Sequence, residues 1–406
     1  SVFSITGGTW NNSGTATVSG AGYVYLYGGT LNNLAGGEIF LNTSTTNAIG
    51  LVSGTSVVNN AGILRQQASG THTILLSGGS GTFNNNGYVY VENGTLRLIP
   101  GGTDSGTYSI AAGTTLDLNS ARTINGSVTG AGTLLSSSGI STLGAASTMN
   151  VGLVSVTGGT LTMAGTSTLG AINVSAGTLN LTDGSAHTLS SLSLTGGTLS
   201  TADTLSVTGA TTLNGGYLTG SGSLTTSGAT TVGALWVRGG ATWNNSGTAT
   251  LGGYNAVYLE GGTINNQASG TLNLNSTYST PIYFYSGTNA FNNAGTLTQQ
   301  ASGTHMLQLV GGAASFNNTG TVDIQAGTLQ IQAGGTDSGN YTIASGSTLQ
   351  FAGGTRTVTG NIGGAGTLLN SGGTSTLAAD STTTVGTVSV SGGTLTMAGA
   401  STLDGV

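Results

Sequence analysis

The chain repeats itself at long range, and this repeat restricts its possible folds more than any other feature. Trp10-Asn11-Asn12-Ser13-Gly14 recurs 233 residues later as Trp243-Asn244-Asn245-Ser246-Gly247. The offset has become 234 at Arg122 and Arg356, so one residue is inserted between the copies. Self-similarity on this scale is typical of arrays in which each unit stacks on the one before. The expected organisation is a first module copy at 1–169, a remainder of the same continuous array at 170–234, and a second, incomplete copy at 235–406.

A shorter repeat recurs inside each module. An apolar residue followed by two asparagines, with a glycine close behind, begins at Trp10, Leu31, Val58 and Phe83, at spacings of 21, 27 and 25. The second copy keeps these spacings from Trp243, Ile264, Phe291 and Phe316. Elsewhere a Gly-Thr-Leu signal recurs with a period of 18 to 20. Between these signals lie runs of four to six residues in which apolar and polar residues alternate, which is the pattern of β-strands.

Short strands separated by turn signals at this interval predict an all-β fold, a parallel β-helix (β-solenoid) of about twenty coils of roughly 18–27 residues. Glycine and asparagine are expected to supply positive-φ corners between the strands. One coil cannot fold alone, because ordering its backbone costs on the order of 20–40 kcal/mol. Its inward apolar side chains return only about 10–15 kcal/mol. Neighbouring coils must therefore complete the backbone ladder and close the apolar column.

Composition excludes several classes of protein. Charged residues make up 4% of the chain, the net charge is −6, and the five basic residues are all arginine. Five scattered arginines cannot neutralise a run of phosphates, so no nucleic-acid partner is expected. No apolar run approaches the roughly 20 residues of a membrane-spanning segment, and no secretory leader opens the chain. The 36% of hydrophobic residues argue against disorder despite 75 glycines, and the absence of cysteine excludes disulfides.

The two copies indicate which side chains face the core. Val89 and Val91 remain apolar in the second copy as Val322 and Ile324, and these positions are expected to point inward. The alternating positions change freely and are expected to point outward. In the first copy, the outward positions of one sheet are Thr15, Thr17, Glu38, Phe40, Arg65, Tyr88 and Tyr90. The matching positions in the second copy are Thr248, Thr250, Thr271, Asn273, Thr298, Thr321 and Asp323.

Outward aromatic side chains are the candidate binding groups. They are Tyr23, Tyr25, Tyr27, Phe40, Tyr88, Tyr90, Tyr283 and Tyr285. Exposed aromatic rings can stack on sugar rings or fill the pocket of a partner. The alternative is that the tyrosines stack on one another along the sheet and stiffen it.

The chain offers little that predicts catalysis, and no catalytic, cofactor-binding or metal-ligating residues are expected. His72, His187 and His305 are assigned turn or strand-edge roles, and Asp104 and Asp337 are expected to cap their own Gly-Gly-Thr-Asp-Ser-Gly loops. Those loops do not match the calcium-binding Gly-Gly-x-Gly-x-Asp repeat. A polysaccharide-degrading β-helix enzyme, a remote alternative, needs paired carboxylates at one place. The expected neighbours are Asp117 with Arg122 and Glu92 with Arg97, and the second copy replaces the latter two with Gln325 and Gln330.

The Asn-Asn-x-Gly turns and Gly-Gly-Thr-Leu coils resemble the passenger regions of secreted bacterial β-solenoid adhesins, namely autotransporter passengers and filamentous-haemagglutinin-like exoproteins. The resemblance covers the whole chain. It implies a secreted protein, extracellular or at the cell surface, without a cofactor. The expected function is a non-enzymatic structural or adhesive shaft of an extracellular bacterial fibre. A glycan- or surface-binding module that uses the exposed aromatic face is the alternative. Because neither end carries a charged or helical cap, end-to-end self-association into fibres is also expected.

Overall fold

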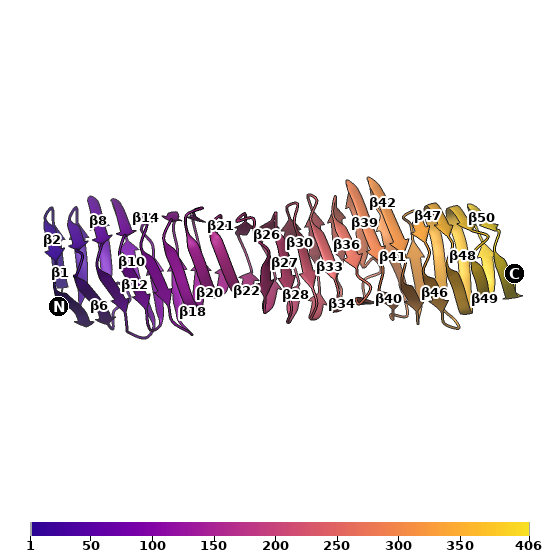
Figure 1. The fold of residues 1–406 in the computed structure, drawn as a ribbon, viewed down its shortest axis with the longest axis horizontal. Coiled ribbons are helices and arrows are strands. Elements are labelled where there is room, and N and C mark those ends of the chain that lie inside the picture. Colours follow the sequence, from indigo (N-terminus) through magenta and orange to yellow (C-terminus); the bar gives the residue numbers. More distant parts are fainter. Residues whose placement is uncertain (1, 406) are drawn as a thin grey trace. The chain divides into compact units, whose positions relative to one another are not determined.

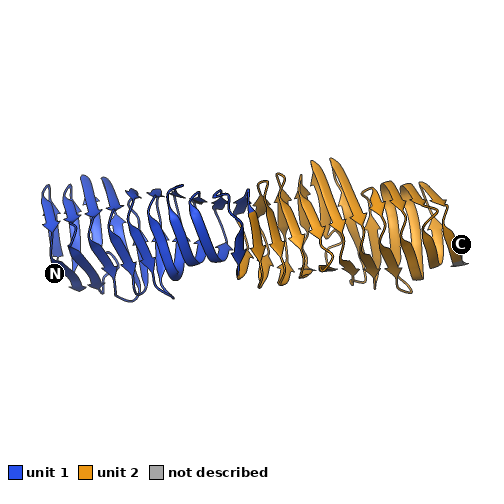
Figure 2. Cartoon of the chain, viewed as in Figure 1, with its two compact units in different colours: residues 1–189, 197–203 blue, residues 190–196, 204–406 orange. Residues whose placement is uncertain are grey.

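The computed structural model describes residues 2–405, and over these residues every regular element is a β-strand. The chain is a parallel β-solenoid of about 20 coils, as the repeat predicts. It contains two compact units, of which unit 1 comprises 1–189 and 197–203 and unit 2 comprises 190–196 and 204–406 (Figure 2). The described part of the chain contains no helix of the length and apolar character needed to cross a membrane.

The strands of unit 1 are β1 (Val2–Thr6), β2 (Thr9–Asn12), β3 (Thr15–Gly20), β4 (Tyr23–Tyr27), β5 (Thr30–Asn33), β6 (Glu38–Thr43), β7 (Ile49–Ser53), β8 (Thr55–Asn60), β9 (Ile63–Gln66), β10 (Thr71–Leu76), β11 (Ser80–Asn85), β12 (Tyr88–Val91), β13 (Thr95–Leu98), β14 (Gly102–Asp104), β15 (Thr107–Ile110), β16 (Thr115–Leu118), β17 (Arg122–Ile124), β18 (Ser127–Ser136), β19 (Ile140–Leu143), β20 (Thr148–Val156), β21 (Thr160–Met163), β22 (Thr166–Val174), β23 (Thr178–Leu181), β24 (His187–Leu189) and β26 (Thr198–Thr201).

The strands of unit 2 are β25 (Ser191–Leu194), β27 (Thr204–Val207), β28 (Thr211–Leu213), β29 (Tyr217–Thr219), β30 (Ser223–Thr226), β31 (Ala229–Val232), β32 (Leu235–Arg238), β33 (Thr242–Asn245), β34 (Thr248–Gly253), β35 (Val257–Glu260), β36 (Thr263–Asn266), β37 (Thr271–Ser276), β38 (Ile282–Ser286), β39 (Thr288–Asn293), β40 (Thr296–Gln299), β41 (Thr304–Leu309), β42 (Ala313–Asn318), β43 (Thr321–Ile324), β44 (Thr328–Ile331), β45 (Gly335–Asp337), β46 (Asn340–Ile343), β47 (Thr348–Val358), β48 (Asn361–Leu377), β49 (Thr382–Val390), β50 (Thr394–Met397) and β51 (Ala400–Gly405).

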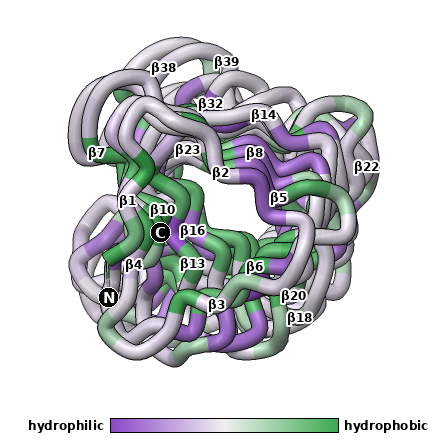
Figure 3. The backbone as a smooth tube through the Cα atoms, turned by 90° about the vertical axis from the view of Figure 1, so that its left-hand side faces the viewer, coloured by the Kyte–Doolittle hydropathy of each residue, from purple (hydrophilic) through white to green (hydrophobic). Residues whose placement is uncertain are grey.

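Each early coil of unit 1 contributes one strand to each of three faces. Face 1 contains β1, β4, β7 and β10, face 2 contains β2, β5, β8 and β11, and face 3 contains β3, β6, β9 and β12. Each strand pairs in parallel with the strand one coil away, so the strands of a unit lie side by side (Figure 1). Figure 3 shows these faces end-on as three sides of each coil. Equivalent residues of successive coils therefore form columns.

The core consists of such columns of aliphatic side chains. In unit 1, the register aligns Leu96, Leu116, Leu134, Val154 and Ile172, which are all buried. Each side chain packs on its equivalent from the coil above and the coil below, because strand pairing brings the coils to within about 5 Å of one another. The alternation of inward apolar and outward polar residues holds as predicted.

The asparagine pairs have a different role from the predicted one. In the described residues every positive φ belongs to a glycine, so no asparagine forms a left-handed corner. The pairs instead end the face 2 strands, with the second asparagine of each pair buried. These side chains donate hydrogen bonds along a column, from Asn12 to Asn33 at 2.8 Å, from Asn33 to Asn60 at 2.7 Å, and from Asn60 to Asn85 at 2.8 Å. A stacked amide satisfies its donor and acceptor with identical groups, which explains why asparagine recurs at this position.

Glycine is required where the coils turn closely over one another. Gly177 has a φ of +69°, and a Cβ there would lie 2.4 Å from the carbonyl oxygen of Gly159 on the preceding coil. Gly197 repeats the arrangement against Gly177. The Gly-Gly-Thr-Leu signal thus marks a corner where both the backbone angle and the space exclude a side chain.

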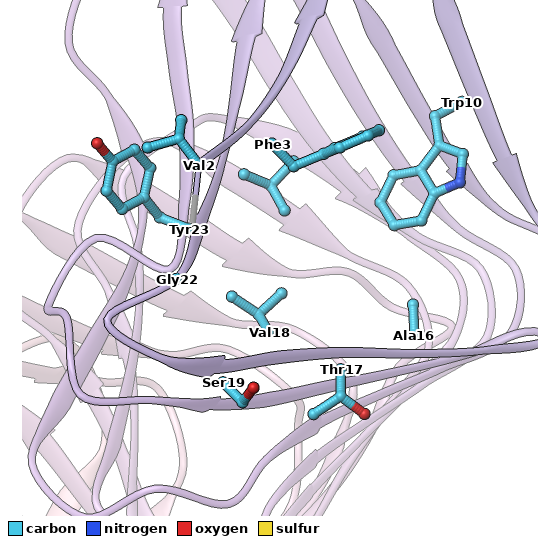
Figure 4. A pocket seen from close by; sticks show the side chains of 10 residues that line it. Val2, Phe3, Trp10, Ala16, Thr17, Val18, Ser19, Gly22 and Tyr23 are labelled. Carbon is cyan, nitrogen blue, oxygen red and sulfur yellow. The ribbon is translucent and has the colours of Figure 1, made fainter.

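The first coil of unit 1 lines a pocket of about 450 Å³ (Figure 4). Phe3 and Trp10 meet there edge to face, with ring centroids 5.0 Å apart. Their register partners on the next coil, Val24 and Leu31, are core residues. The apolar lining of this pocket is therefore the same column that later coils bury, and not a separate set of recognition groups.

Candidate functional site

The outward positions of face 3 in unit 1 form two columns, as the comparison of the copies predicts. One column contains Thr15, Glu38, Ile63 and Tyr88, and the other contains Thr17, Phe40, Arg65 and Tyr90. Phe40 and Tyr90 thus lie directly on either side of Arg65. The alternation positions these side chains, since Ile39, Leu64 and Val89 next to them are buried.

Arg65 organises this surface. Its Nε donates a 2.6 Å hydrogen bond to Glu38 Oε1, and its Nη1 pairs with Glu92. The guanidinium carbon also lies 4.5 Å from the ring centroid of Tyr90. The hydrogen bond to Glu38 raises the pKa of Arg65 above its usual value. Each partner is partly solvated, so these ion pairs orient the side chains more than they stabilise the fold.

Tyr88 is the exposed aromatic residue of this group. Its side chain is 51% exposed, and its ring lies nearly parallel to that of Tyr90, with a 10° angle and a centroid separation of 6.2 Å. We call the set Glu38, Phe40, Arg65, Tyr88, Tyr90 and Glu92 the aromatic-ionic patch. An aromatic ring beside carboxylates and a guanidinium can stack on the apolar face of a sugar and accept or donate hydrogen bonds to its hydroxyls.

The second copy lacks this patch. Thr271, Asn273, Thr321 and Asp323 occupy the corresponding positions of face 3 in unit 2, in the same register. Thr298, which stands where the first copy has Arg65, is 5% exposed and not the solvent-facing residue predicted. It lies between Asn273 and Asp323 in the column, and a short side chain between two longer ones is covered by them.

The other predicted aromatic residues of unit 1 belong to a different face. Tyr23, Tyr25 and Tyr27 all lie on β4 of face 1, with centroid separations of 4.3 Å and 6.5 Å between successive rings. The Tyr25 ring covers Gly50 on the next coil, where an added Cβ would lie 2.7 Å from it. The structure therefore does not unite these tyrosines with the aromatic-ionic patch.

Unit 2 contains an aromatic ladder that the sequence reasoning missed. The register of β29, β32, β35 and β38 aligns Tyr217, Trp236, Tyr258 and Tyr283, of which only Tyr283 was predicted as a surface group. Ring centroids are 4.3 Å apart between Trp236 and Tyr258 and 5.0 Å apart between Tyr258 and Tyr283, with planes within 12° and 3° of parallel. The alternation of Leu235 with Val237 and of Val257 with Leu259 was the signal that could have found it.

The ladder favours a structural role, because Trp236 and Tyr258 each have an aromatic neighbour on both sides in the column. Arg238 covers Tyr217 at 3.8 Å, and Tyr285 meets Trp236 edge to face at 5.5 Å. Stacked pairs of this kind each contribute about 0.5–1.5 kcal/mol beyond burial.

A second group of tyrosines borders the ladder. The hydroxyls of Tyr278 and Tyr283 are 2.7 Å apart, and this hydrogen bond raises the pKa of Tyr278 to about 12. Tyr254, 75% exposed, meets Tyr278 edge to face.

Two histidines stand near the start of a strand, as predicted, but their rings are buried. His72 is the second residue of β10, but its ring is buried between the Gln66 side chain at 2.6 Å and the Thr43 carbonyl at 2.7 Å. His305 repeats this with Gln299 and the Ser276 carbonyl, and burial lowers its pKa. In both rings, Nε2 lies 2.7 Å from a backbone carbonyl oxygen that can accept a hydrogen bond from it. Each histidine thus joins strands one coil apart.

The carboxylates are also used differently from the prediction. Asp104 does not cap its own loop. It forms a buried ion pair with Arg122 at 2.7 Å and accepts a hydrogen bond from the backbone N–H of Asn85 at 2.8 Å. Asp337 repeats the pair with Arg356. Asp117 pairs with Arg97, so neither predicted pairing, Asp117 with Arg122 or Glu92 with Arg97, is the one that forms.

Neither the family models, the curated proteins nor the solved structures with which the chain was compared contain a match. The functional argument therefore depends on the fold and on the surfaces described above.

Proposed function

We propose that the chain is the non-enzymatic structural and adhesive shaft of an extracellular bacterial fibre or surface adhesin. The observation that carries the proposal is the stacking of equivalent side chains of successive coils in columns. Buried asparagines, aliphatic residues and aromatic rings all use their interaction capacity on the neighbouring coil. A molecule built in this way extends by adding coils and presents long surfaces, which suits a scaffold.

The acidic residues support a structural role over a catalytic one. A glycoside-cleaving β-helix needs two carboxylates free to exchange protons or attack a sugar. In this chain, Asp104, Asp117 and Asp337 have buried side chains that are paired with arginines. Carboxylates held in this way are used to bind coils together.

The location and the self-association belong to the same proposal, and the resemblance to secreted adhesins supports them. Antibody labelling of intact cells that produce the chain tests the location, with lysed cells as the control. Electron microscopy and sedimentation velocity of the purified chain test end-to-end assembly into fibres. Label confined to lysed cells, or hydrolysis of a polysaccharide from a representative panel, would contradict the proposal.

A second candidate function is glycan binding, and the aromatic-ionic patch favours it. Tyr88 is half exposed beside a guanidinium and two carboxylates, and the second copy replaces the patch with small polar residues. The chain thus supplies its own control. The triple variant Phe40→Asn, Tyr88→Thr, Tyr90→Asp transfers the unit 2 residues to unit 1.

A glycan array compares this variant with the parent chain. Under the glycan-binding hypothesis, the triple variant loses binding by at least tenfold, while Tyr285→Thr on unit 2 does not. Equal binding by the triple variant and the parent would refute a role for the patch and leave the shaft proposal intact.

A further inference from the structure

A cluster of three ligand-type side chains lies at the end of unit 1, away from the aromatic-ionic patch. Asp183 lies in the loop that joins β23 to β24, His187 is the first residue of β24, and Asp203 follows β26. Strands β23 and β26 pair so that Leu181 lies opposite Thr201. The two aspartates each stand two residues beyond this pair, so the stacking of coils brings them together.

The ligand atoms of the three side chains converge. One atom from each residue lies within 4.8 Å of the others, and His187 Nε2 is 3.0 Å from Asp183 Oδ1. Metal–ligand bonds of about 2.0 Å at tetrahedral angles place two ligand atoms about 3.3 Å apart. The cluster is therefore of the right size for a small divalent cation after minor side-chain adjustment.

The charges of the cluster are not balanced within the protein. The Asp183 side chain has no solvent exposure and that of His187 has 1%. Other buried carboxylates, such as Asp104, are neutralised by an arginine, whereas among the described residues no arginine pairs with Asp183 or Asp203. Two carboxylates carry two negative charges, and an imidazole supplies at most one positive charge. Asp203 is half-buried, whereas the Asp183 carboxylate is fully buried. A buried carboxylate without a compensating charge is costly, so the cluster favours a bound cation.

The surrounding hydrogen bonds orient the ligands. Ser167 Oγ donates a 2.7 Å hydrogen bond to Asp183 Oδ2, which leaves Oδ1 directed at the histidine. The backbone N–H of Gly184 lies 3.3 Å from Asp203 Oδ2, and the N–H of Asp203 bonds Thr201 Oγ1 at 2.9 Å. Metal-binding side chains are usually fixed by partners of this kind.

We propose that Asp183, His187 and Asp203 bind a divalent transition-metal ion of the zinc class. One imidazole nitrogen with two carboxylate oxygens suits zinc and its neighbours, whereas calcium requires six to eight oxygens. The ion links Asp183 and His187 of one coil to Asp203 of the following coil, so it would stabilise the contact between the two coils. Within the residues that the structure describes, this is the one cluster of three ligand-type side chains whose ligand atoms converge in this way.

The test is metal binding by the full chain after treatment with EDTA and dialysis. Calorimetric titration with ZnSO4 is expected to show one Zn²⁺ per chain, and CoCl2 is expected to give the visible absorption bands of cobalt with nitrogen and oxygen ligands. Asp203→Asn, which keeps the side-chain shape, is expected to lower the zinc affinity at least tenfold, and Ser167→Ala about tenfold. His72→Gln, at another buried histidine, is the matched control and is expected to bind zinc like the parent chain.

The proposal is overturned if the parent chain takes up no stoichiometric zinc, or if Asp203→Asn binds zinc as tightly as the parent. Stoichiometric binding of CaCl2 in preference to ZnSO4 overturns the assigned class of metal. The titration of the parent chain requires no substitution, so it decides the question even where a variant fails to fold, as judged by circular dichroism.

Discussion

Replacing Asn60 by alanine tests whether the buried asparagine column holds the coils together. Asn60 is 2% exposed, accepts a hydrogen bond from Asn33 at 2.7 Å, and donates to Asn85 Oδ1 at 2.8 Å and to the Tyr88 carbonyl at 3.0 Å. A single buried hydrogen bond contributes about 0.5–1.5 kcal/mol, and an orphaned buried acceptor costs about 1–3 kcal/mol. Three lost bonds and the orphaned Asn85 oxygen together give an expected loss of about 2.5–7.5 kcal/mol.

Hydrogen exchange is the appropriate assay, because solenoid coils open locally and a single global unfolding energy does not describe them. At about 1.4 kcal/mol per factor of ten, Asn60→Ala is expected to speed exchange of the β8, β11 and β12 amides at least about 60-fold. The matched control is Asn59→Ala, since Asn59 makes two 3.0 Å amide bonds on the partly solvated side of the same strand. Its effect is expected to stay below about tenfold.

The second copy supplies an independent replicate. Asn293 accepts from Asn266 at 2.8 Å and donates to Asn318 at 2.8 Å and to the Thr321 carbonyl at 3.0 Å. Asn293→Ala is therefore expected to accelerate exchange by a similar factor, at β39, β42 and β43. Equal effects of Asn60→Ala and Asn59→Ala would refute the reasoning, because the inner and outer columns would then contribute alike.

Three further predictions concern other columns. Arg122→Met alone is expected to lower the local opening free energy of β14 and β17, measured by hydrogen exchange, by about 3–5 kcal/mol, because the Asp104 charge is left buried without a partner. Adding Asp104→Leu is expected to restore most of the loss, and a double variant that exchanges as fast as the single one contradicts this. The pKa of Tyr278 is raised to about 12 in the folded chain, so this hydroxyl ionises first in the unfolded chain, and its stabilising hydrogen bond to Tyr283 is complete below pH 10 and lost between pH 10 and about 12. Ultraviolet titration should show a tyrosine that ionises near pH 12, and an unchanged titration curve in Tyr283→Phe would argue against this assignment. Gly177→Ala is expected to lower the melting temperature measurably, because the new methyl group meets the backbone of the preceding coil; a variant that melts like the parent chain would show that the corner tolerates a side chain.

The fold class and the inward and outward directions could be predicted because strand alternation has a fixed period of two. Val89 and Val322, which alternate with variable residues and stay aliphatic in both copies, are both buried, as this period predicts. The same rule positions the two columns of face 3 in unit 1 correctly, whereas Thr298 in unit 2 is buried against the prediction. It could also have identified Trp236 and Tyr258, which stand between buried aliphatic residues in the same way.

Partnerships between coils could not be predicted in this way, because each depends on the residue count of the intervening coil. Asp117 is five residues from Arg122 but lies opposite Arg97 in the register, so the nearer residue in sequence is the wrong partner. The asparagine pairs were misread for the same reason. The hydrogen bonds between their side chains run to the next coil, 21 to 27 residues away. Some of these asparagines also donate to their own turn, as Asn12 does to the Gly14 carbonyl at 3.0 Å.

The sequence by itself determined that the chain is a stack of similar β-coils, since a periodic pattern of apolar residues and glycines can bury its side chains only against copies of itself. The tertiary structure alone decided which side chains meet across coils. Coil lengths vary, and one residue more or less changes the partner of every residue that follows. The convergence of Asp183, His187 and Asp203, and the continuous ring ladder from Tyr217 to Tyr283, exist only in that register.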